Sequence, residues 1–207
     1  YWIVYNGEIY NFREVANVLS GLGTTFNSST DTEVLLKGYI QWGPEILDRL
    51  NGMFAFAIWD DHEKSLFCAR DRIGIKPLYY TIQQNQFVFA SDIKTLIASG
   101  LYKPEANIEG LYHNMSFGIA PRPMTSFKGV HALEQGCWMK IAKDGNIAKF
   151  CFWKLPVGTQ DSSMGKNEAV ELLEKALTKS VTLRLQADVP VGTFMSGGVD
   201  STLISAI

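Results

Sequence analysis

The most constraining segment of the chain is an apolar run that ends in two adjacent glycines. The run covers residues 189–195, and Ser196-Gly197-Gly198-Val199-Asp200-Ser201 and a second apolar stretch follow it. This order predicts a buried strand, a tight turn and a helix. Glycines let backbone N–H groups turn toward an anion, and a helix start adds positive charge, so the segment fits a phosphate site. An ordinary strand-turn-helix corner is the alternative, and a Walker-type loop is excluded because no Gly-Lys-Ser/Thr follows the glycines.

The string Ser-Gly-Gly-Val-Asp-Ser resembles the pyrophosphate loop of the ATP pyrophosphatase family. Members of that family cleave ATP to AMP and pyrophosphate while adenylating a carboxylate or carbonyl, so the resemblance implies ATP and Mg²⁺ as cofactors. It implies that pyrophosphate is held by the loop residues Ser196, Gly197, Gly198 and Ser201. It also implies that Asp200 binds Mg²⁺, a hard cation with oxygen ligands, and that Phe194 meets adenine through backbone groups.

A second candidate site lies near the first residues of the chain. Residues 1–5 are β-formers and run into Asn6-Gly7-Glu8. An Asn side chain beside a Gly N–H provides two converging donors at the end of a strand, which is what the oxyanion of an acyl transfer requires. A plain Asn-Gly turn is the alternative. Asp31 stands at the start of a predicted helix over 31–41, where helix capping is the competing role.

The longer string Asn-Gly-Glu-Ile-Tyr-Asn is similar to the glutamine-site segment of class II glutamine amidotransferases, which are N-terminal nucleophile enzymes. The strings GMFAFAIWD, ARDRIGIKPLYY and FASDIKTL closely resemble the glutaminase half of glutamine-hydrolysing asparagine synthetases. Both motif sets occur in that family's order, so the resemblance covers the whole chain. It implies glutamine-dependent asparagine synthesis, with glutamine, aspartate and ATP as substrates. It also implies an oxyanion hole of Asn6 and Gly7, with Glu8 and Asp31 binding the glutamine α-ammonium.

The chain departs from this family at the nucleophile, which is an N-terminal Cys that uses its own α-amine as base. Residue 1 here is Tyr, and the three cysteines lie in apolar, strand-like runs that are typical of buried, inert thiols: Cys68, Cys137 and Cys151. The chain stops at Ile207, within the helix after the loop. We therefore expect an internal fragment of a longer ligase, with neither glutaminase nor synthetase activity of its own.

Two other functions remain open at this stage. An amidotransferase of sugar or secondary metabolism would keep the scaffold and change the acceptor, whereas a β-lactam-forming relative is disfavoured because Asn6, Gly7, Glu8 and Asp31 are all present. A relative without the Cys that acts as a binding or regulatory module is the second alternative.

The composition of the chain argues against some classes of binding partner. A net charge of −2 offers no basic field for nucleic acid or an anionic membrane surface, and no apolar stretch is long enough to span a bilayer. Three cysteines without Cys-x-x-Cys spacing favour a reducing, cytoplasmic compartment over a disulfide framework or a zinc site. The resemblance is compatible with a homodimer of the full-length protein.

The expected fold class is α+β. By resemblance, residues 1–155 form an incomplete αββα sandwich of the N-terminal nucleophile hydrolase type, and residues 166–207 begin an α/β domain of the adenine nucleotide α-hydrolase type. Residues 156–165 are rich in breakers and are expected to form a linker. The apolar run at 53–60 predicts a buried central strand, and the charged segment from Arg70 to Lys76 predicts an ion-paired structural turn.

Overall fold

The chain is divided into two compact units. The computed structural model describes residues 1–158, 164–187 and 189–207. One unit comprises Tyr1–Lys154 and the other Leu155–Ile207. Half of the expected linker, residues 159–163, lies outside the described residues.

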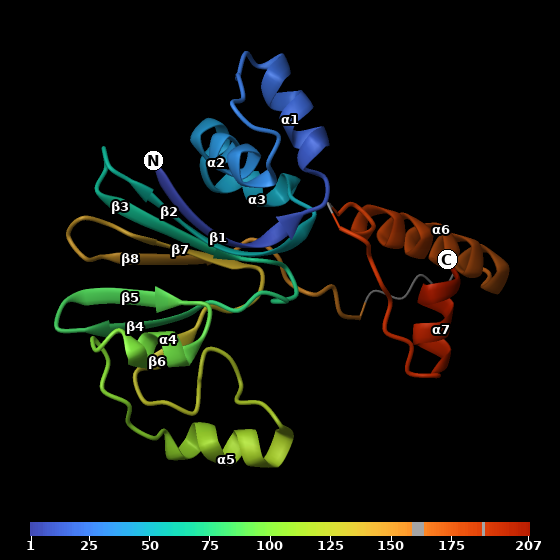
Figure 1. Cartoon of the computed structure of the whole chain (residues 1–207). Coiled ribbons are helices and arrows are strands. Elements are labelled where there is room, and N and C mark those ends of the chain that lie inside the picture. Colours follow the sequence, from blue (N-terminus) through green and yellow to red (C-terminus); the bar gives the residue numbers. More distant parts are fainter. Residues whose placement is uncertain (159–163, 188) are drawn as a thin grey trace. The chain divides into compact units, whose positions relative to one another are not determined.

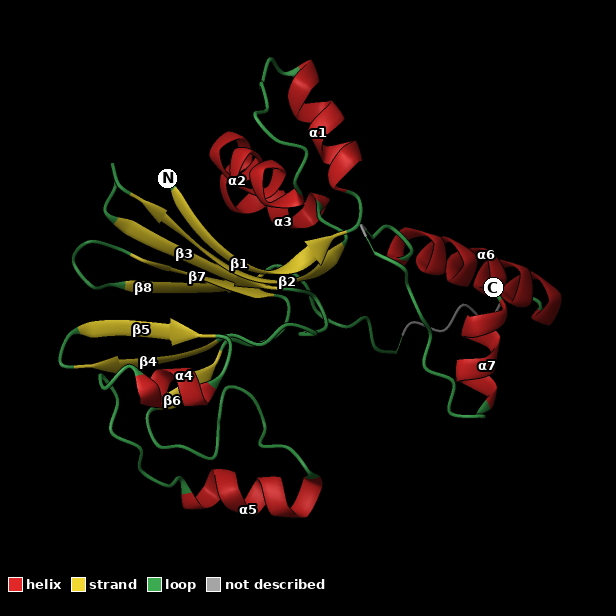
Figure 2. Cartoon of the chain, viewed as in Figure 1, coloured by secondary structure: helices red, strands yellow, loops and turns green. Residues whose placement is uncertain are grey.

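Two antiparallel sheets form the centre of the first unit (Figure 1). The larger has the order β1-β2-β3-β7-β8 and the smaller β5-β4-β6. Their strands are β1 (Trp2–Ile9), β2 (Gly52–Asp60), β3 (Ser65–Arg70), β4 (Tyr79–Gln83), β5 (Gln86–Ala90), β6 (Val130–Ala132), β7 (Cys137–Ile141) and β8 (Ile147–Cys151). The helical segments are α1 (Phe12–Gly21), α2 (Asp31–Trp42), the 3₁₀ turn η1 (Gly43–Glu45), α3 (Ile46–Arg49), α4 (Ile93–Ala98) and α5 (Ile108–Phe117). Helices α1–α3 cover the outer face of the larger sheet, and α4 covers the smaller one (Figure 2). This arrangement confirms the predicted αββα layers.

Alternate side chains of β2 belong to two different hydrophobic cores, one on each face of the strand. The large side chains Phe54, Phe56 and Ile58 pack under the helices, whereas Ala55 and Ala57 face the smaller sheet. Successive strand residues point to opposite faces, so a run that is apolar at every position serves two interfaces. The prediction of a buried central strand is confirmed, because β2 is paired on both sides.

The segment from Arg70 to Lys76 is a structural turn, but backbone hydrogen bonds hold it. The Asp71 carboxylate is 1% exposed and accepts four backbone N–H groups, those of Phe54, Ile73, Ile75 and Lys76. The buried Arg70 guanidinium donates to three carbonyls, one of which is that of Leu133 at 2.7 Å. Burial, followed by repulsion from Arg122, lowers the pKa of Arg70 below its ordinary value. The expectation of ion pairing was wrong for these two side chains in the described part of the chain, because main-chain groups of the turn, of Phe54 and of Leu133 satisfy both.

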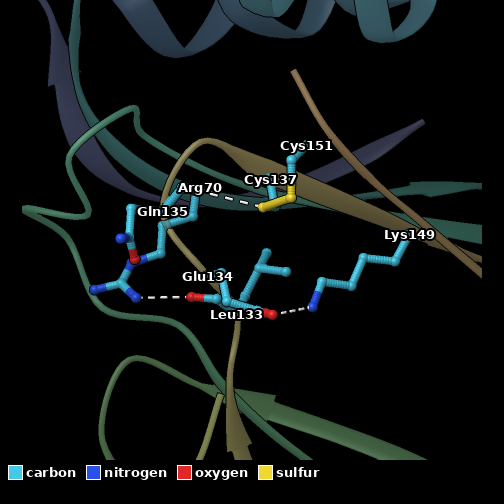
Figure 3. The surroundings of a disulfide bond; sticks show 7 residues. All are labelled: Arg70, Leu133, Glu134, Gln135, Cys137, Lys149 and Cys151. Atoms are coloured by element: carbon cyan, nitrogen blue, oxygen red, sulfur yellow. Dashed lines mark hydrogen bonds and ion pairs between the residues drawn. A yellow bond between two sulfur atoms is a disulfide. The ribbon is translucent and has the colours of Figure 1, made fainter. Parts of the chain in front are cut away.

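A disulfide joins Cys137 and Cys151, which corrects the expectation of three unpaired thiols (Figure 3). The two cysteines stand directly opposite each other on β7 and β8, with Cα atoms 3.9 Å apart. In the sequence, the pair Asp144-Gly145 is a hairpin signal that favours a four-residue turn at 143–146, and such a turn would place Cys137 opposite Phe152. The observed register pairs Ile141 with Ile147. This register leaves a five-residue connection between the strands and places Cys151 opposite Cys137. A one-residue change of register thus decides whether the bridge forms.

The disulfide closes a short loop between residues 14 apart in the sequence. Reduction with dithiothreitol is expected to lower the free energy of unfolding by about 3 kcal/mol, because the reduced chain regains the entropy that loop closure removes. Urea unfolding with and without dithiothreitol measures this difference. A double variant Cys137→Ser/Cys151→Ser serves as control, since its midpoint should not respond to the reductant. Equal midpoints for the oxidised and reduced native protein would contradict the prediction.

Among its described residues, the second unit contains the helices α6 (Lys166–Arg184) and α7 (Val199–Ala206). The expected strand before the glycines is absent: residues 189–195 form no strand, and Phe194 and Met195 are exposed. A strand needs a hydrogen-bonded neighbour, and none of the described strands pairs with this segment. No helix among the described residues is long and apolar enough to cross a membrane.

Candidate active site

The first candidate site is built on the outer edge of β1. Among the described strands, β1 pairs only with β2. The Tyr10 N–H, directly after β1, donates inward to Asn51 O at 2.8 Å, whereas the Ile9 N–H donates to Asp31 Oδ2 at 3.0 Å. Alternate residues of an antiparallel strand direct their N–H groups to opposite sides. The odd-numbered residues of β1 therefore present their N–H groups at the outer edge.

Gly7 is one of these odd-numbered residues. Its partner across the ladder, Phe54, exchanges hydrogen bonds with Asp71 on the far side: Phe54 N–H donates to Asp71 Oδ2 at 3.2 Å, and Asp71 N–H donates to Phe54 O at 2.8 Å. The Gly7 N–H is therefore directed away from β2. A Cβ at this position would lie 2.2 Å from Met53 O and 2.9 Å from the Tyr5 ring, so only glycine fits.

Asn6 and Glu8 lie on the opposite face of β1 from Gly7, because strand side chains alternate. The Asn6 amide donates from Nδ2 to Ser91 Oγ at 3.2 Å, directly after β5. Ala55, the partner of Asn6 on β2, belongs to the core between the two sheets. Both Asn6 and Glu8 are half-buried. The two predicted donors, the Asn6 side-chain amide and the Gly7 N–H, therefore lie within β1, which continues to Ile9. The alternative prediction of a plain Asn-Gly turn is wrong.

Asp31 is the first residue of α2, as predicted, but it does not cap the helix. Thr30 is the N-cap, and its hydroxyl accepts the Glu33 N–H. The Asp31 carboxylate instead accepts Tyr5 Oη–H at 2.7 Å and the Ile9 N–H on the same oxygen, Oδ2. Burial, reinforced by the hydrogen bond to Asp31, raises the pKa of Tyr5 above its ordinary value, so the phenol stays protonated and donates.

The loop before α2 is held by Glu33, whose role was not predicted. Its carboxylate accepts the backbone N–H groups of Asn27 and Ser28 and the Ser28 hydroxyl. These contacts, the Ser28 hydroxyl first, lower the pKa of Glu33. The sequence Thr30-Asp31-Thr32-Glu33 could have indicated a role for Glu33, because the pattern Thr-x-x-Glu is typical of a capped helix start. Tyr5 was also missed, since no local pattern links residues 26 positions apart.

The edge of β1 thus brings together a hydrogen-bond donor and an anionic acceptor. Two residues of strand span about 6.6 Å, so the Gly7 N–H lies one such step from the Ile9 N–H that Asp31 accepts. An N–H donor suits a developing oxyanion, and a carboxylate suits an ammonium group. The arrangement fits a small ligand that carries both groups at a separation of a few bonds.

None of the three cysteines is placed as a nucleophile. Cys68 is fully buried in β3, and burial raises its thiol pKa, which disfavours the thiolate. Cys137 and Cys151 are bonded to each other.

The second candidate site is the loop before α7. Gly198 is the N-cap of this helix and provides no side chain, and Gly197 has φ +80°, a conformation that favours glycine. The hydroxyls of Ser196 and Ser201 are 3.0 Å apart, so these four residues are brought together. Asp200 lies in the first turn of α7, and Phe194 is fully exposed before the loop. Among the described residues, no group of three or more His, Cys, Asp or Glu could hold a metal ion, so Asp200 is not part of such a cluster.

Family models match almost the whole chain in two parts. Residues 1–153 match the glutamine amidotransferase domain, and residues 172–207 match asparagine synthase. Asparagine synthetase [glutamine-hydrolyzing] 1 of Bacillus subtilis is 40% identical over all of this chain, which spans about a third of that protein, 32% of its length.

Two solved structures share the fold. The allosteric regulatory enzyme of purine biosynthesis has a TM-score of 0.54 at 21% identity, over 75% of this chain and 29% of its own. Glutamine phosphoribosylpyrophosphate amidotransferase of B. subtilis has a TM-score of 0.53 at 18% identity, over 99% of this chain and 43% of its own. The layered sheets, the edge site on β1 and these matches lead to one conclusion: the chain belongs to the glutamine amidotransferase domain family and is similar along its whole length to glutamine-hydrolysing asparagine synthetases.

Proposed function

We propose that the protein to which this chain belongs uses glutamine as a nitrogen source for asparagine synthesis. The observation that carries the proposal is the edge of β1, where the outward Gly7 N–H lies one strand step from the Ile9 N–H that the Asp31 carboxylate accepts. Glutamine bears an amide carbonyl at one end and an α-ammonium near the other. An N–H donor and a carboxylate one strand step apart are suited to these two groups.

In the proposed glutaminase half, the thiolate of the N-terminal Cys that the family resemblance implies attacks the amide carbon, and the C=O electron pair moves onto the oxygen to form an oxyanion. The Gly7 N–H and the Asn6 Nδ2–H donate to it, and Asn6 exchanges its present contact with Ser91 for the substrate. Glu8 and Asp31 bind the α-ammonium by charge. Collapse of the tetrahedral species releases ammonia and leaves the acyl group for hydrolysis to glutamate.

In the proposed synthetase half, the loop before α7 holds the pyrophosphate part of ATP. The fit rests on the glycine N-cap, the open space around Gly197 and the paired hydroxyls of Ser196 and Ser201. Mg²⁺ is commonly bound by one or two carboxylates together with phosphate oxygens, so a single Asp200 is compatible with it. Backbone groups near Phe194 would meet adenine. ATP would adenylate the side-chain carboxylate of aspartate with release of pyrophosphate, and ammonia would then displace AMP to give the amide.

Replacement of Asn6 by alanine tests the glutaminase half. The variant Asn6→Ala in the whole protein is expected to lower kcat for glutamine hydrolysis about a hundredfold, because one oxyanion donor is lost. The readout is glutamate released from glutamine. Asn114→Ala is the control, since Asn114 is exposed on α5 and its variant should keep wild-type activity. A variant Asn6→Ala with unchanged kcat would refute the assignment.

A further inference from the structure

Tyr5 connects the two parts of the proposed glutaminase site. Its side chain lies on the same face of β1 as Gly7, two residues away. The ring approaches so closely that a Cβ on Gly7 would lie 2.9 Å from Tyr5 Cε2. At its far end the phenol donates to Asp31 Oδ2 at 2.7 Å. One side chain therefore contacts both the residue that presents the oxyanion donor and the carboxylate.

The bonds to Asp31 distinguish its two oxygens. Oδ2 already accepts two hydrogen bonds, from Tyr5 and from the Ile9 N–H. Oδ1 has a single long contact, with Thr32 Oγ1 at 3.4 Å. The carboxylate is thereby oriented by one oxygen and has capacity for a cation on the other.

We infer that Tyr5 is a positioning residue that orients Asp31 for the α-ammonium of glutamine. This inference rests on the proposed glutaminase function. Without the phenol, only the Ile9 N–H would hold Oδ2, and the carboxylate could rotate. Binding of a ligand with an α-ammonium should then weaken, whereas the oxyanion donors keep their places on β1.

The test is Tyr5→Phe in the whole protein, with Tyr80→Phe as the matched control. Tyr80 is a half-buried tyrosine on β4 that stacks on Phe87, and like Tyr5 its pKa is raised, chiefly by burial. For Tyr5→Phe we expect KM for glutamine to rise about tenfold and kcat to stay within about twofold, since a hydrogen bond to a charged group is lost. Tyr80→Phe should leave both constants unchanged. An unchanged KM in Tyr5→Phe would overturn the inference.

The second substrate is glutaric acid monoamide, which has the amide and carboxylate of glutamine but no α-amino group. Wild type and Tyr5→Phe should hydrolyse it with equal kcat/KM, because no ammonium reaches Asp31. An equal loss on both substrates would mean that Tyr5 only supports the fold, and would refute the inference. In an Asp31→Asn background, Tyr5→Phe should have no further effect on KM, and a further tenfold rise there would likewise refute it.

Calorimetric binding of glutamine separates this inference from the proposed function. A wild-type protein that binds glutamine but does not hydrolyse it would refute the glutaminase activity, and a tenfold weaker Kd in Tyr5→Phe would still support the role of Tyr5. Equal Kd values for the two proteins would overturn that role. Absence of glutamine binding by the wild type would refute both.

Discussion

Replacement of Asp71 by alanine is expected to lower the free energy of unfolding by about 4 kcal/mol, the largest effect on stability that we predict. The carboxylate is buried and accepts four backbone N–H groups, including that of Phe54 in the central strand. Alanine leaves these donors without their shared partner, and the Phe54 N–H is buried whereas the other three are partly buried. Each buried unsatisfied donor costs about 1–3 kcal/mol, and partial relaxation of the turn reduces the sum.

Urea unfolding followed by tryptophan fluorescence measures this loss. Asp61→Ala is the matched control, because Asp61 also accepts two side-chain hydrogen bonds in a turn but its side chain is 60% exposed. Exposed contacts of this kind contribute about 1 kcal/mol or less. Similar losses of unfolding free energy for the two variants would contradict the prediction, because they would show that the buried hydrogen bonds of Asp71 stabilise the fold no more than the exposed ones of Asp61.

Replacement of Gly7 by alanine is expected to reduce glutamine hydrolysis by the whole protein at least about a thousandfold. The added methyl group would lie 2.2 Å from Met53 O and 2.7 Å from Phe54 Cα, both backbone atoms of β2. Relief of these overlaps requires β1 to move away from β2, which displaces the N–H that we assign to the oxyanion. Overpacking of this kind also costs about 1–3 kcal/mol of stability.

The control for this variant is Gly21→Ala. A Cβ at Gly21 meets nothing within 4 Å, and the residue lies at the end of α1, where alanine is the better helix former. Gly21→Ala should therefore keep full activity and equal or greater stability. Glutamate release and thermal unfolding are measured on both variants. Retained activity in Gly7→Ala would contradict both the contact and the proposed oxyanion donor.

Local patterns in the sequence identify several elements of the first unit. The apolar run of β2, the helix at Asp31 and the β7–β8 hairpin have periodicities or turn residues that can be recognised in isolation. Three short elements were not predicted: α3 has four residues, and η1 and β6 have three each, lengths at which no period can be established.

Local patterns could not predict features that depend on strand register or on residues distant in the sequence. The cysteine pair required the alignment of β7 with β8 to within one residue. Asp71 was expected to pair with charged neighbours, but Phe54, 17 residues earlier, provides one of its donors. The run at 189–195 was apolar enough for a buried strand, yet hydrophobicity alone does not supply a neighbouring strand. In the candidate site, Asn6, Gly7, Glu8 and Asp31 remain predictions in their assigned roles. The placement of the first three along β1 came only from the ladder, and the contact of Asp31 with that strand came only from its hydrogen bonds to Tyr5 and Ile9.

The edge position of β1 has a consequence for aggregation as well as for recognition. A row of unpaired N–H groups at the side of a sheet is a template on which another chain can add a strand. Here the Ile9 N–H is occupied by the Asp31 carboxylate, which places negative charge on that row. An approaching strand would have to displace a charged hydrogen bond to continue the ladder. The group proposed to select the substrate therefore also opposes unwanted pairing of the same edge.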